Sequence, residues 1–267
     1  MKNIVFIVNI GGGDDRNKPY HYSIKSWKSW ADKNNAELFV LTEHVYESDY
    51  MHLNWHKSLA LKLLKENNVE YDQVLIVDAD TIVHPDCPNF FEETEGKFCG
   101  VVNEGCYEWV TRSIENYGDY IFPEIPKIKP WDYFNSGFII ANKTHEEFFD
   151  NVLQYYHDNV DKFIHAKSFY VGNDQTPLNY FTKKFNIETK LFKFALKKDE
   201  EALKGMGAKY ADIHDEGDGM TAKYITGKDG EIERLSMSRV ETRLRSMLKE
   251  EPASLVEKIF DLEKIVE

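Results

Sequence analysis

The chain has 267 residues, of which 42% are hydrophobic, 14% aromatic and 30% charged. Acidic residues outnumber basic ones by 46 to 33, and the resulting net charge of -13 argues against a nucleic-acid-binding protein, which needs a basic face. The length and the apolar content predict one large globular domain, or one domain with a small appendage, around an ample core.

The cysteines and the N-terminal residues bear on the cellular compartment. Cys87, Cys99 and Cys106 form no Cys-x-x-Cys motif and no even set, so we expect free thiols in a reducing environment. The apolar run at the N-terminus is too short to span a membrane and lacks a signal-peptide cleavage region. We therefore predict a cytoplasmic protein without a transmembrane segment.

Strand and helix patterns alternate through the first part of the chain. Apolar runs at 3–10, 38–41 and 74–78 predict strands. Apolar residues three and four apart predict helices at 20–34 and 55–68. This order predicts an α/β fold with a mixed, mainly parallel sheet flanked by helices. In such sheets ligands bind beyond the carboxyl ends of the strands.

The middle of the chain continues with strands at 98–103 and 134–142. Between them, residues 104–132 are rich in aromatic residues and prolines, and we expect them to be irregular. Such a stretch is either a functional loop, such as a lid or an acceptor-binding wall, or a surface insertion with a few helical turns. Thr144, with Glu147 three residues later, is expected to cap the helix that follows.

The C-terminal part begins with a helix around 178–181 and a lysine-rich stretch, which is either a solvated face or a surface that attracts an anionic acceptor. Residues 210–214 predict a last core strand, and the glycines after it predict a loose segment. We predict helices from 232 onward, so that 231–267 form a C-terminal helical extension. These helices are candidates for a homodimer contact, but their two heptads are too short to specify a coiled coil.

Asp78-Ala79-Asp80 ends a short apolar run that reads as a buried strand. Residues two apart in a strand point to the same side, so the two carboxylates can converge on one ligand. A desolvated carboxylate is costly unless it is paired or bound to a metal. Two hard oxygen donors at this place suit a divalent cation that carries phosphates. The spacing alone often arises by chance, and an exposed pair in a loop is the alternative.

Four segments between about residues 50 and 180 carry a family resemblance. In chain order they are Trp55-His56-Lys57-Ser58-Leu59, Val77-Asp78-Ala79-Asp80-Thr81, Tyr133-Phe134-Asn135-Ser136-Gly137-Phe138-Ile139-Ile140 and Gly172-Asn173-Asp174-Gln175-Thr176-Pro177-Leu178-Asn179. Together they resemble the motifs of GT-A-fold glycosyltransferases, most of all the retaining family that includes glycogenin and bacterial lipooligosaccharide galactosyltransferases. Their joint order is far more specific than any one of them.

A fifth segment matches that family only in part. Ile213-His214-Asp215-Glu216-Gly217 resembles the start of the family's His-x-x-Gly-x-x-Lys-Pro-Trp segment, but Met220 stands where the lysine is expected and Pro-Trp is missing. The resemblance therefore implies that His214 is a metal ligand and that Gly217 lies at the donor substrate. The family's lysine has no counterpart here.

The resemblance implies a GT-A, Rossmann-like catalytic domain at 1–230. Its implied reaction moves a sugar from a nucleoside-diphosphate sugar, a UDP-sugar by family inference, to an acceptor hydroxyl with retention of configuration. The acceptor would be a glycan, a lipid-linked compound or another hydroxyl compound. The implied partners are therefore a nucleotide-sugar donor and this acceptor.

The metal and the diphosphate would be bound from three elements. The leaving diphosphate gathers negative charge, which a divalent ion stabilises. The implied ligands are Asp78, Asp80 and His214, and mixed carboxylate and imidazole ligation suits Mn²⁺ better than Mg²⁺, the alternative. Asp78 is also expected to reach the ribose. Lys57 is the expected cation for the diphosphate or the sugar hydroxyls, with a solvated helix lysine as the alternative.

The remaining site residues belong to the third and fourth segments. Asn135 and Ser136 are expected to recognise hydroxyl groups, next to Gly137, which permits close approach of the backbone. Asp174 and Gln175 are the expected catalytic residues beside the donor sugar, with Gln175 stabilising the reacting face. Asp174 is equally well placed to cap the helix that follows it.

Other functions stay open. A haloacid-dehalogenase-type phosphohydrolase also uses Asp-x-Asp after an apolar strand, but usually on the first strand and with Thr or Val where this chain has Ile82. A catalytically lapsed sugar-nucleotide-binding protein would account for the missing Lys-Pro-Trp. A nucleotidyltransferase is disfavoured by Asp14-Asp15, which would repel phosphate where that class has a basic loop.

Overall fold

The structure, a computed structural model, describes residues 2–11, 20–83, 87–103, 107–167, 172–192, 210–215, 220–226 and 231–236, the last three stretches by their backbone alone. The chain divides into two compact units. The first comprises Met1–Gly12, Asn35–Asp78 and Asn89–Phe194, and the second comprises Gly13–Asn34, Ala79–Pro88 and Ala195–Glu267. Asp78 and Asp80 therefore belong to different units, although a single residue separates them.

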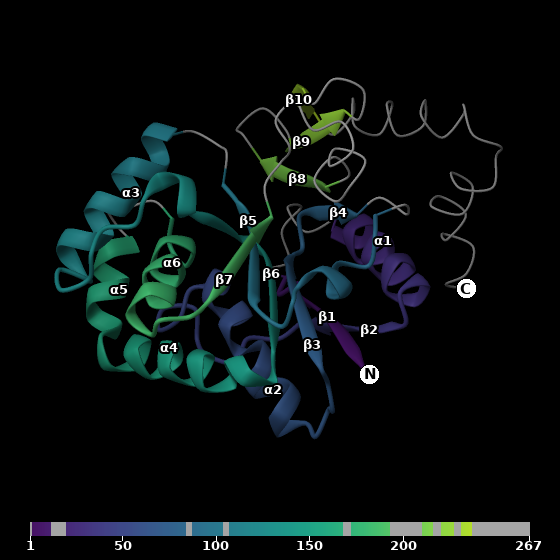
Figure 1. The fold of residues 1–267 in the computed structure, drawn as a ribbon, viewed down its shortest axis with the longest axis horizontal. Helices are drawn as coiled ribbons and strands as arrows, with labels where there is room; N and C mark the ends of the chain where they lie inside the picture. The colour runs from purple at the N-terminus through teal and green to yellow at the C-terminus, as the bar shows by residue number, and fades with distance from the viewer. Residues whose placement is uncertain are drawn as a thin grey trace. The chain divides into compact units, whose positions relative to one another are not determined.

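The strands of the first unit are β1 (Asn3–Val8), β2 (Ala36–Leu41), β3 (Gln73–Asp78), β5 (Phe98–Val102), β6 (Phe134–Asn142) and β7 (Thr189–Phe192). They form one sheet in the order β2-β1-β3-β6-β5-β7 (Figure 1). β1 is parallel to β2 and β3, and β5 is parallel to β7, whereas β6 runs antiparallel to β3 and β5. The predicted α/β class with a mixed, mainly parallel sheet is confirmed, and this sheet is consistent with a GT-A fold.

The central strands are apolar because both faces of the sheet are covered. Val5, Phe6 and Ile7 in β1 are fully buried, and so are Val74 and its two successors in β3. Such strands read as continuous apolar runs. The apolar run of β3 stops at the last residue of the strand, so its aspartate lies at the carboxyl end, the side where open α/β sheets bind ligands.

The helical elements of the first unit are η2 (Leu53–Leu59), α2 (Ala60–Glu66), η3 (Phe90–Glu93), α3 (Tyr107–Tyr120), η4 (Pro130–Asp132), η5 (Lys143–His145), α4 (Glu146–Asp158), α5 (Val160–Lys167) and α6 (Gln175–Lys184). Figure 1 shows α3 to α6 grouped beside the sheet. Trp55 of η2 lies in their aromatic core, with its ring centroid 4.6 Å from that of Tyr156 and 5.0 Å from that of Phe163. This packing fixes the short helix that carries Lys57.

The second unit contains α1 (Tyr20–Lys33), β4 (Thr81–Val83), β8 (Tyr210–Asp215), β9 (Met220–Thr226) and β10 (Glu231–Ser236). Its four strands form an antiparallel sheet in the order β10-β9-β8-β4. The indole N–H of Trp27 donates to the hydroxyl of Thr81 at 2.9 Å, and that of Trp30 donates to the carbonyl of Cys87 at 3.3 Å. These bonds join α1 to the β4 segment.

The predicted helix from 232 onward is wrong for residues 232–236, which belong to β10. Ile232 and Leu235 are three residues apart, which is a helical spacing, but antiparallel pairing with β9 supplies the backbone partners of this stretch. The loose segment expected after residue 214 likewise contains a strand, β9. Residues 237–267 lie outside the described residues, and with them the remaining helices and the homodimer contact that we predict.

The irregular stretch predicted at 104–132 is wrong for its first half, where α3 spans fourteen residues. Val110, Ile114 and Tyr117, three or four residues apart, are buried along one face of this helix. The alternative of helical turns in this stretch is the better description. The aromatic residues and prolines of the stretch led to the prediction of a loop, although residues 107–120 have a regular amphipathic pattern.

The predicted cap at Thr144 is also wrong. The side-chain oxygen of Asn142 accepts the N–H of Thr144 at 2.9 Å, and Nδ1 of His145 accepts the N–H of Asn142 at 3.1 Å. These reciprocal bonds form a capping box, so the helical segment begins with η5 ahead of α4. The hydroxyl of Thr144 donates to the same asparagine oxygen at 2.6 Å.

Two further observations concern the compartment. Cys87 and Cys99 are buried free thiols, while Cys106 is outside the described residues. In the described part of the chain, none of the helices combines the length and the apolarity needed to cross a lipid bilayer. The cytoplasmic location stays a prediction.

Candidate active site

β6 has an irregular register where it passes the end of β3. The pairs that it makes with β5 skip the residues between Asn135 and Ile139, and its pairs with β3 end at Phe138. Ser136 and Gly137 therefore lie in the gap of both registers. Bulges of this kind are common beside active sites, because they turn backbone and side chains out of the regular ladder.

The side chain of Asn179 on α6 forms hydrogen bonds with the backbone of β6 next to this bulge. Its side-chain oxygen accepts the N–H of Phe134 at 2.9 Å, and its side-chain nitrogen donates to the carbonyl of Phe134 at 2.9 Å. The same nitrogen donates to the carbonyl of Gln175 at 2.9 Å. Asn179 is buried, and it ties α6 to β6.

Replacement of Asn179 tests this tie. We expect Asn179→Ala to lower the free energy of unfolding by about 3 kcal/mol, because it leaves a buried N–H and a buried C=O without partners at about 1–3 kcal/mol each. Chemical denaturation measures the loss. Thr182→Ala is the matched control, since it removes a buried hydroxyl that donates to the carbonyl of Asn179 at 2.8 Å. Equal losses in the two variants would contradict a special role for Asn179.

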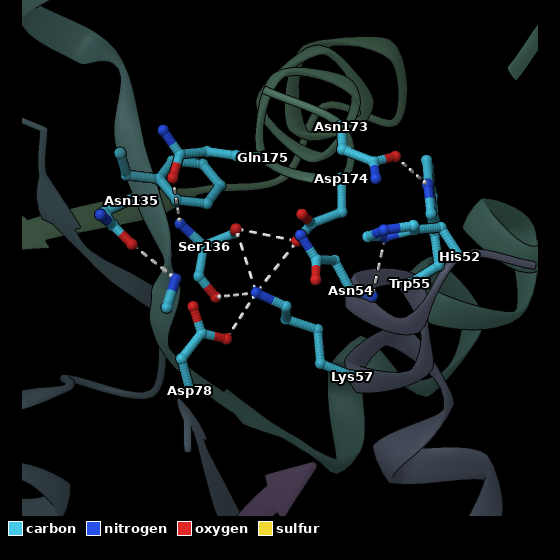
Figure 2. A network of polar contacts seen from close by, with 12 residues as sticks. His52, Asn54, Trp55, Lys57, Asp78, Asn135, Ser136, Asn173, Asp174 and Gln175 are labelled. Carbon is cyan, nitrogen blue, oxygen red and sulfur yellow. Dashed lines mark hydrogen bonds and ion pairs between the residues drawn. The ribbon is translucent and has the colours of Figure 1, made fainter. Parts of the chain in front are cut away.

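Two more bonds hold the bulge itself (Figure 2). The N–H of Ser136 donates to Oε1 of Gln175 at 3.2 Å, and the N–H of Gly137 donates to Oδ1 of Asn135 at 2.6 Å. Backbone N–H groups need acceptors, so these contacts fix both amide oxygens toward the backbone. The bulge therefore brings Asn135, Ser136, Gly137 and Gln175 together.

Lys57 is the centre of a buried ionic network (Figure 2). Its ammonium lies 2.7 Å from Oδ1 of Asp78 and 3.0 Å from Oδ2 of Asp174. The carbonyl and the hydroxyl of Ser136 each lie 3.3 Å from it. Burial by itself lowers the pKa of Lys57, but the charges of Asp174 and Asp78 outweigh it and raise the pKa above its ordinary value. Lys57 is only 5% exposed, so the alternative of a solvated helix lysine is wrong.

Asp174 occupies the position before α6 without capping it. Its side chain makes no capping hydrogen bond. Instead Oδ2 accepts the hydroxyl proton of Ser136 at 2.8 Å and pairs with Lys57. The side chain of Asp174 is 7% exposed, whereas that of Asp78 is 39% exposed. Of the two carboxylates in this network, Asp78 is the one that faces solvent.

Gly137 is needed because of the space that Asp78 occupies. A Cβ atom at this position would lie 2.6 Å from Oδ2 of Asp78 and 2.9 Å from Oδ1 of Asn135. Contacts below about 3 Å between such atoms are strongly repulsive. The absence of a side chain at Gly137 therefore permits the close approach of β6 to the carboxyl end of β3.

The other expected metal ligands belong to the second unit. β4 and β8 pair with Thr81 opposite Asp212, so the backbone places Asp80 and His214 at the same end of this strand pair. The side chain of His214 and all of Gly217 are outside the described residues. Among the described side chains, no three His, Cys, Asp or Glu residues come together as a metal site. The side chain of Asp78 in the first unit is 39% exposed, and the metal site stays a prediction.

Sequence reasoning missed two supporting residues. Asn179 stands in the fourth motif segment, one helical turn after Gln175, but nothing in the pattern shows that it binds the backbone of β6. Asn173 accepts the indole N–H of Trp55 at 3.2 Å and thereby joins the segment before α6 to η2. The spacing of four residues between Gln175 and Asn179, which places both on one face of the helix, is the signal that could have identified Asn179.

Comparisons with known proteins add little. No protein-family model matches the sequence, and no curated protein matches it either. One solved structure with a similar backbone is described as the crystal structure of a glycosyltransferase involved in the glycosylation of the major capsid of PBCV-1. The two chains are 10% identical, the match covers 73% of this chain and 83% of that one, and the TM-score is 0.49. A likeness of this size assigns neither a family nor an activity.

Proposed function

We propose that this chain is a metal-dependent glycosyltransferase that moves a sugar from a nucleoside-diphosphate sugar, a UDP-sugar, to an acceptor hydroxyl with retention. The observation that carries the proposal is the buried network of Lys57, Asp78, Ser136 and Asp174 at the carboxyl end of β3. Its members come from four segments that resemble the motifs of one glycosyltransferase family. A chance resemblance would not require these residues to contact one another.

Charge at the leaving group is the first requirement of this reaction. A divalent cation, when bound, would supply electrophilic stabilisation of the departing diphosphate. Asp78 and Asp80 would hold it as oxygen ligands, with His214 as the nitrogen ligand, and Mn²⁺ fits this set better than Mg²⁺. The partly exposed carboxylate of Asp78, which also pairs with Lys57, supports this role.

The two expected catalytic residues would act on the sugar without attacking it. Asp174 is bound to Lys57 and Ser136, which holds it as a fixed negative charge. Gln175 is neutral, and its Oε1 already accepts the N–H of Ser136. With these contacts neither group would attack the anomeric carbon, so the acceptor hydroxyl would react directly. Attack from the side of the leaving group, and hence retention, is what the family resemblance implies. Asn135 and Ser136 would recognise hydroxyls of the donor.

A thermal-shift screen of nucleotide sugars with and without Mn²⁺ tests the proposed function. We expect a UDP-sugar with Mn²⁺ to raise the Tm by roughly 5 to 10 °C at a concentration of about 100 times Kd, because only the folded chain binds it. Removal of Mn²⁺ by a chelator should abolish the shift. A parallel assay with p-nitrophenyl phosphate tests the haloacid-dehalogenase alternative.

Each outcome of the screen separates one alternative. Turnover of p-nitrophenyl phosphate without binding of any sugar nucleotide would replace the proposed function by phosphohydrolysis. Metal-dependent binding of a UDP-sugar without release of UDP, in the presence of varied hydroxyl acceptors, would indicate the lapsed binding protein that the missing Lys-Pro-Trp permits.

A further inference from the structure

We propose that Lys57 is a positioning residue, which holds the carboxylates of Asp78 and Asp174 in place and does not itself bind the diphosphate of the donor. This proposal rests on the proposed function for its donor. It replaces the diphosphate-binding role that the sequence predicts for this lysine.

The hydrogen-bonding capacity of Lys57 is the first argument. An ammonium group has three N–H donors and no acceptor. Four acceptor atoms surround it within 3.3 Å: one oxygen each of Asp78 and Asp174, and the carbonyl and hydroxyl of Ser136 (Figure 2). The donors of Lys57 are therefore fully used inside the protein, and none is left for a phosphate oxygen.

Burial is the second argument. Lys57 is 5% exposed, and its Nζ lies among atoms of η2, β3, β6 and the start of α6. To reach a diphosphate it would have to leave two carboxylates, one of them buried, without their cation. Removing one member of a buried ion pair is strongly destabilising, because the remaining charge has lost its compensation. The contact with phosphate would have to offset that cost.

The charge of the network is the third argument. One ammonium and two carboxylates leave one net negative charge, and the exposed member, Asp78, presents it to solvent. A surface of this sign attracts a cation and repels a phosphate. The diphosphate would therefore meet the network through a cation at Asp78, while Lys57 keeps the carboxylate of Asp78 oriented.

Ser136 supports the same division of roles. Its hydroxyl donates to Asp174 and, with the carbonyl, lies within reach of Lys57. Lys57 thus links three segments that are far apart in the sequence. Its removal should misplace chiefly the buried carboxylate of Asp174, whereas at saturating Mn²⁺ the more exposed carboxylate of Asp78 would still be held by the cation. The expected signature is a loss in kcat with little change in donor affinity.

The test compares Lys57→Met with Lys62→Met, a control lysine on α2 that faces Glu66 at the surface. The affinities for UDP and UMP are measured by calorimetry at saturating Mn²⁺. The kcat and KM are measured from the release of UDP from UDP-glucose and UDP-galactose, with water as the acceptor. Both assays are run below the Tm of each variant. We expect Lys57→Met to lower kcat by about 100-fold, with KM and the ratio of UDP to UMP affinity within about threefold of wild type. A tenfold fall in that ratio would show contact with the diphosphate and overturn the proposal.

A stability measurement keeps this result separate from the proposed function. Lys57→Met should lower the Tm, and the double variant Lys57→Met/Asp174→Asn should recover at least half of the loss, because the uncompensated carboxylate is gone. A double variant no more stable than Lys57→Met would overturn the holding role. If the wild type bound no UDP-sugar, the proposed function would be wrong, and so would the statement about the diphosphate of the donor. Recovery of the Tm in the double variant would still show that Lys57 holds the two carboxylates in place.

Discussion

Gly137→Ala is expected to lower sugar-nucleotide turnover by at least about 100-fold. The added methyl group would lie 2.6 Å from Oδ2 of Asp78, so either this carboxylate or the bulge of β6 has to move. Misplacement of a reacting group by about 1 Å costs on the order of 100-fold in rate. The fold itself should survive, because an overpacked site of this kind costs about 1–3 kcal/mol. UDP release from a UDP-sugar, measured per folded molecule, checks the result.

Gly118→Ala is the matched control for this variant. A Cβ at Gly118 would lie 2.4 Å from the hydroxyl of Tyr180, an overlap as severe as that at Gly137 but with no carboxylate of the site. We expect Gly118→Ala to lose stability and to keep its turnover per folded molecule. Normal turnover in Gly137→Ala, or an equal loss of turnover in both variants, would contradict the prediction that turnover depends on the close approach of β6 to Asp78.

Asp80→Ala should abolish the Mn²⁺-dependent binding of the donor while the chain stays folded. Loss of one oxygen ligand removes part of the charge that would hold the cation, and groups that stabilise a leaving charge contribute at least about 100-fold to turnover. Asp80 follows the end of β3 and is only partly buried, so its removal leaves no large cavity. Thermal shift with a UDP-sugar, at increasing Mn²⁺ concentration, measures the effect. Asp80→Asn should behave in the same way, because it keeps the shape and removes the charge.

The control for Asp80 is a carboxylate just before the other end of β3. Asp72 is exposed just before β3, and its removal takes away a surface charge without touching the carboxyl end of the sheet. Asp72→Ala should bind donor and Mn²⁺ as the wild type does. Mn²⁺-dependent turnover that persists in Asp80→Ala would exclude this aspartate as a ligand.

Much of the candidate site could be predicted from the sequence. Lys57, Asp78 and the residues around Ser136 and Gln175 were all expected at one place, and in the first unit they do contact one another. The resemblance of the four segments, in their order, to the motifs of one glycosyltransferase family made this prediction possible. Burial was harder to predict. Nothing in the local sequence distinguishes a solvated lysine from one enclosed by two carboxylates.

The errors in secondary structure have a common physical origin. Residues 231–236 have a helical spacing of apolar residues but pair with β9, and α3 lies in a stretch whose prolines suggested a loop. In both cases the packing partner outweighed local preference. The capping residue is Asn142 and not the predicted Thr144. Both residue types can cap a helix, and the backbone geometry selects Asn142.

By itself the sequence determined the α/β alternation, the strand that ends at Asp78 and the set of residues that meet beside it, because periodicity and motif order are properties of the chain. Only the tertiary structure decided what each of those residues binds. It encloses Lys57 between Asp78 and Asp174, directs Asp174 away from capping α6 and gives the backbone of Phe134 a side-chain partner on α6. Hydrogen-bonding capacity and burial are decided by neighbours far apart in the chain, and local sequence carries no record of them.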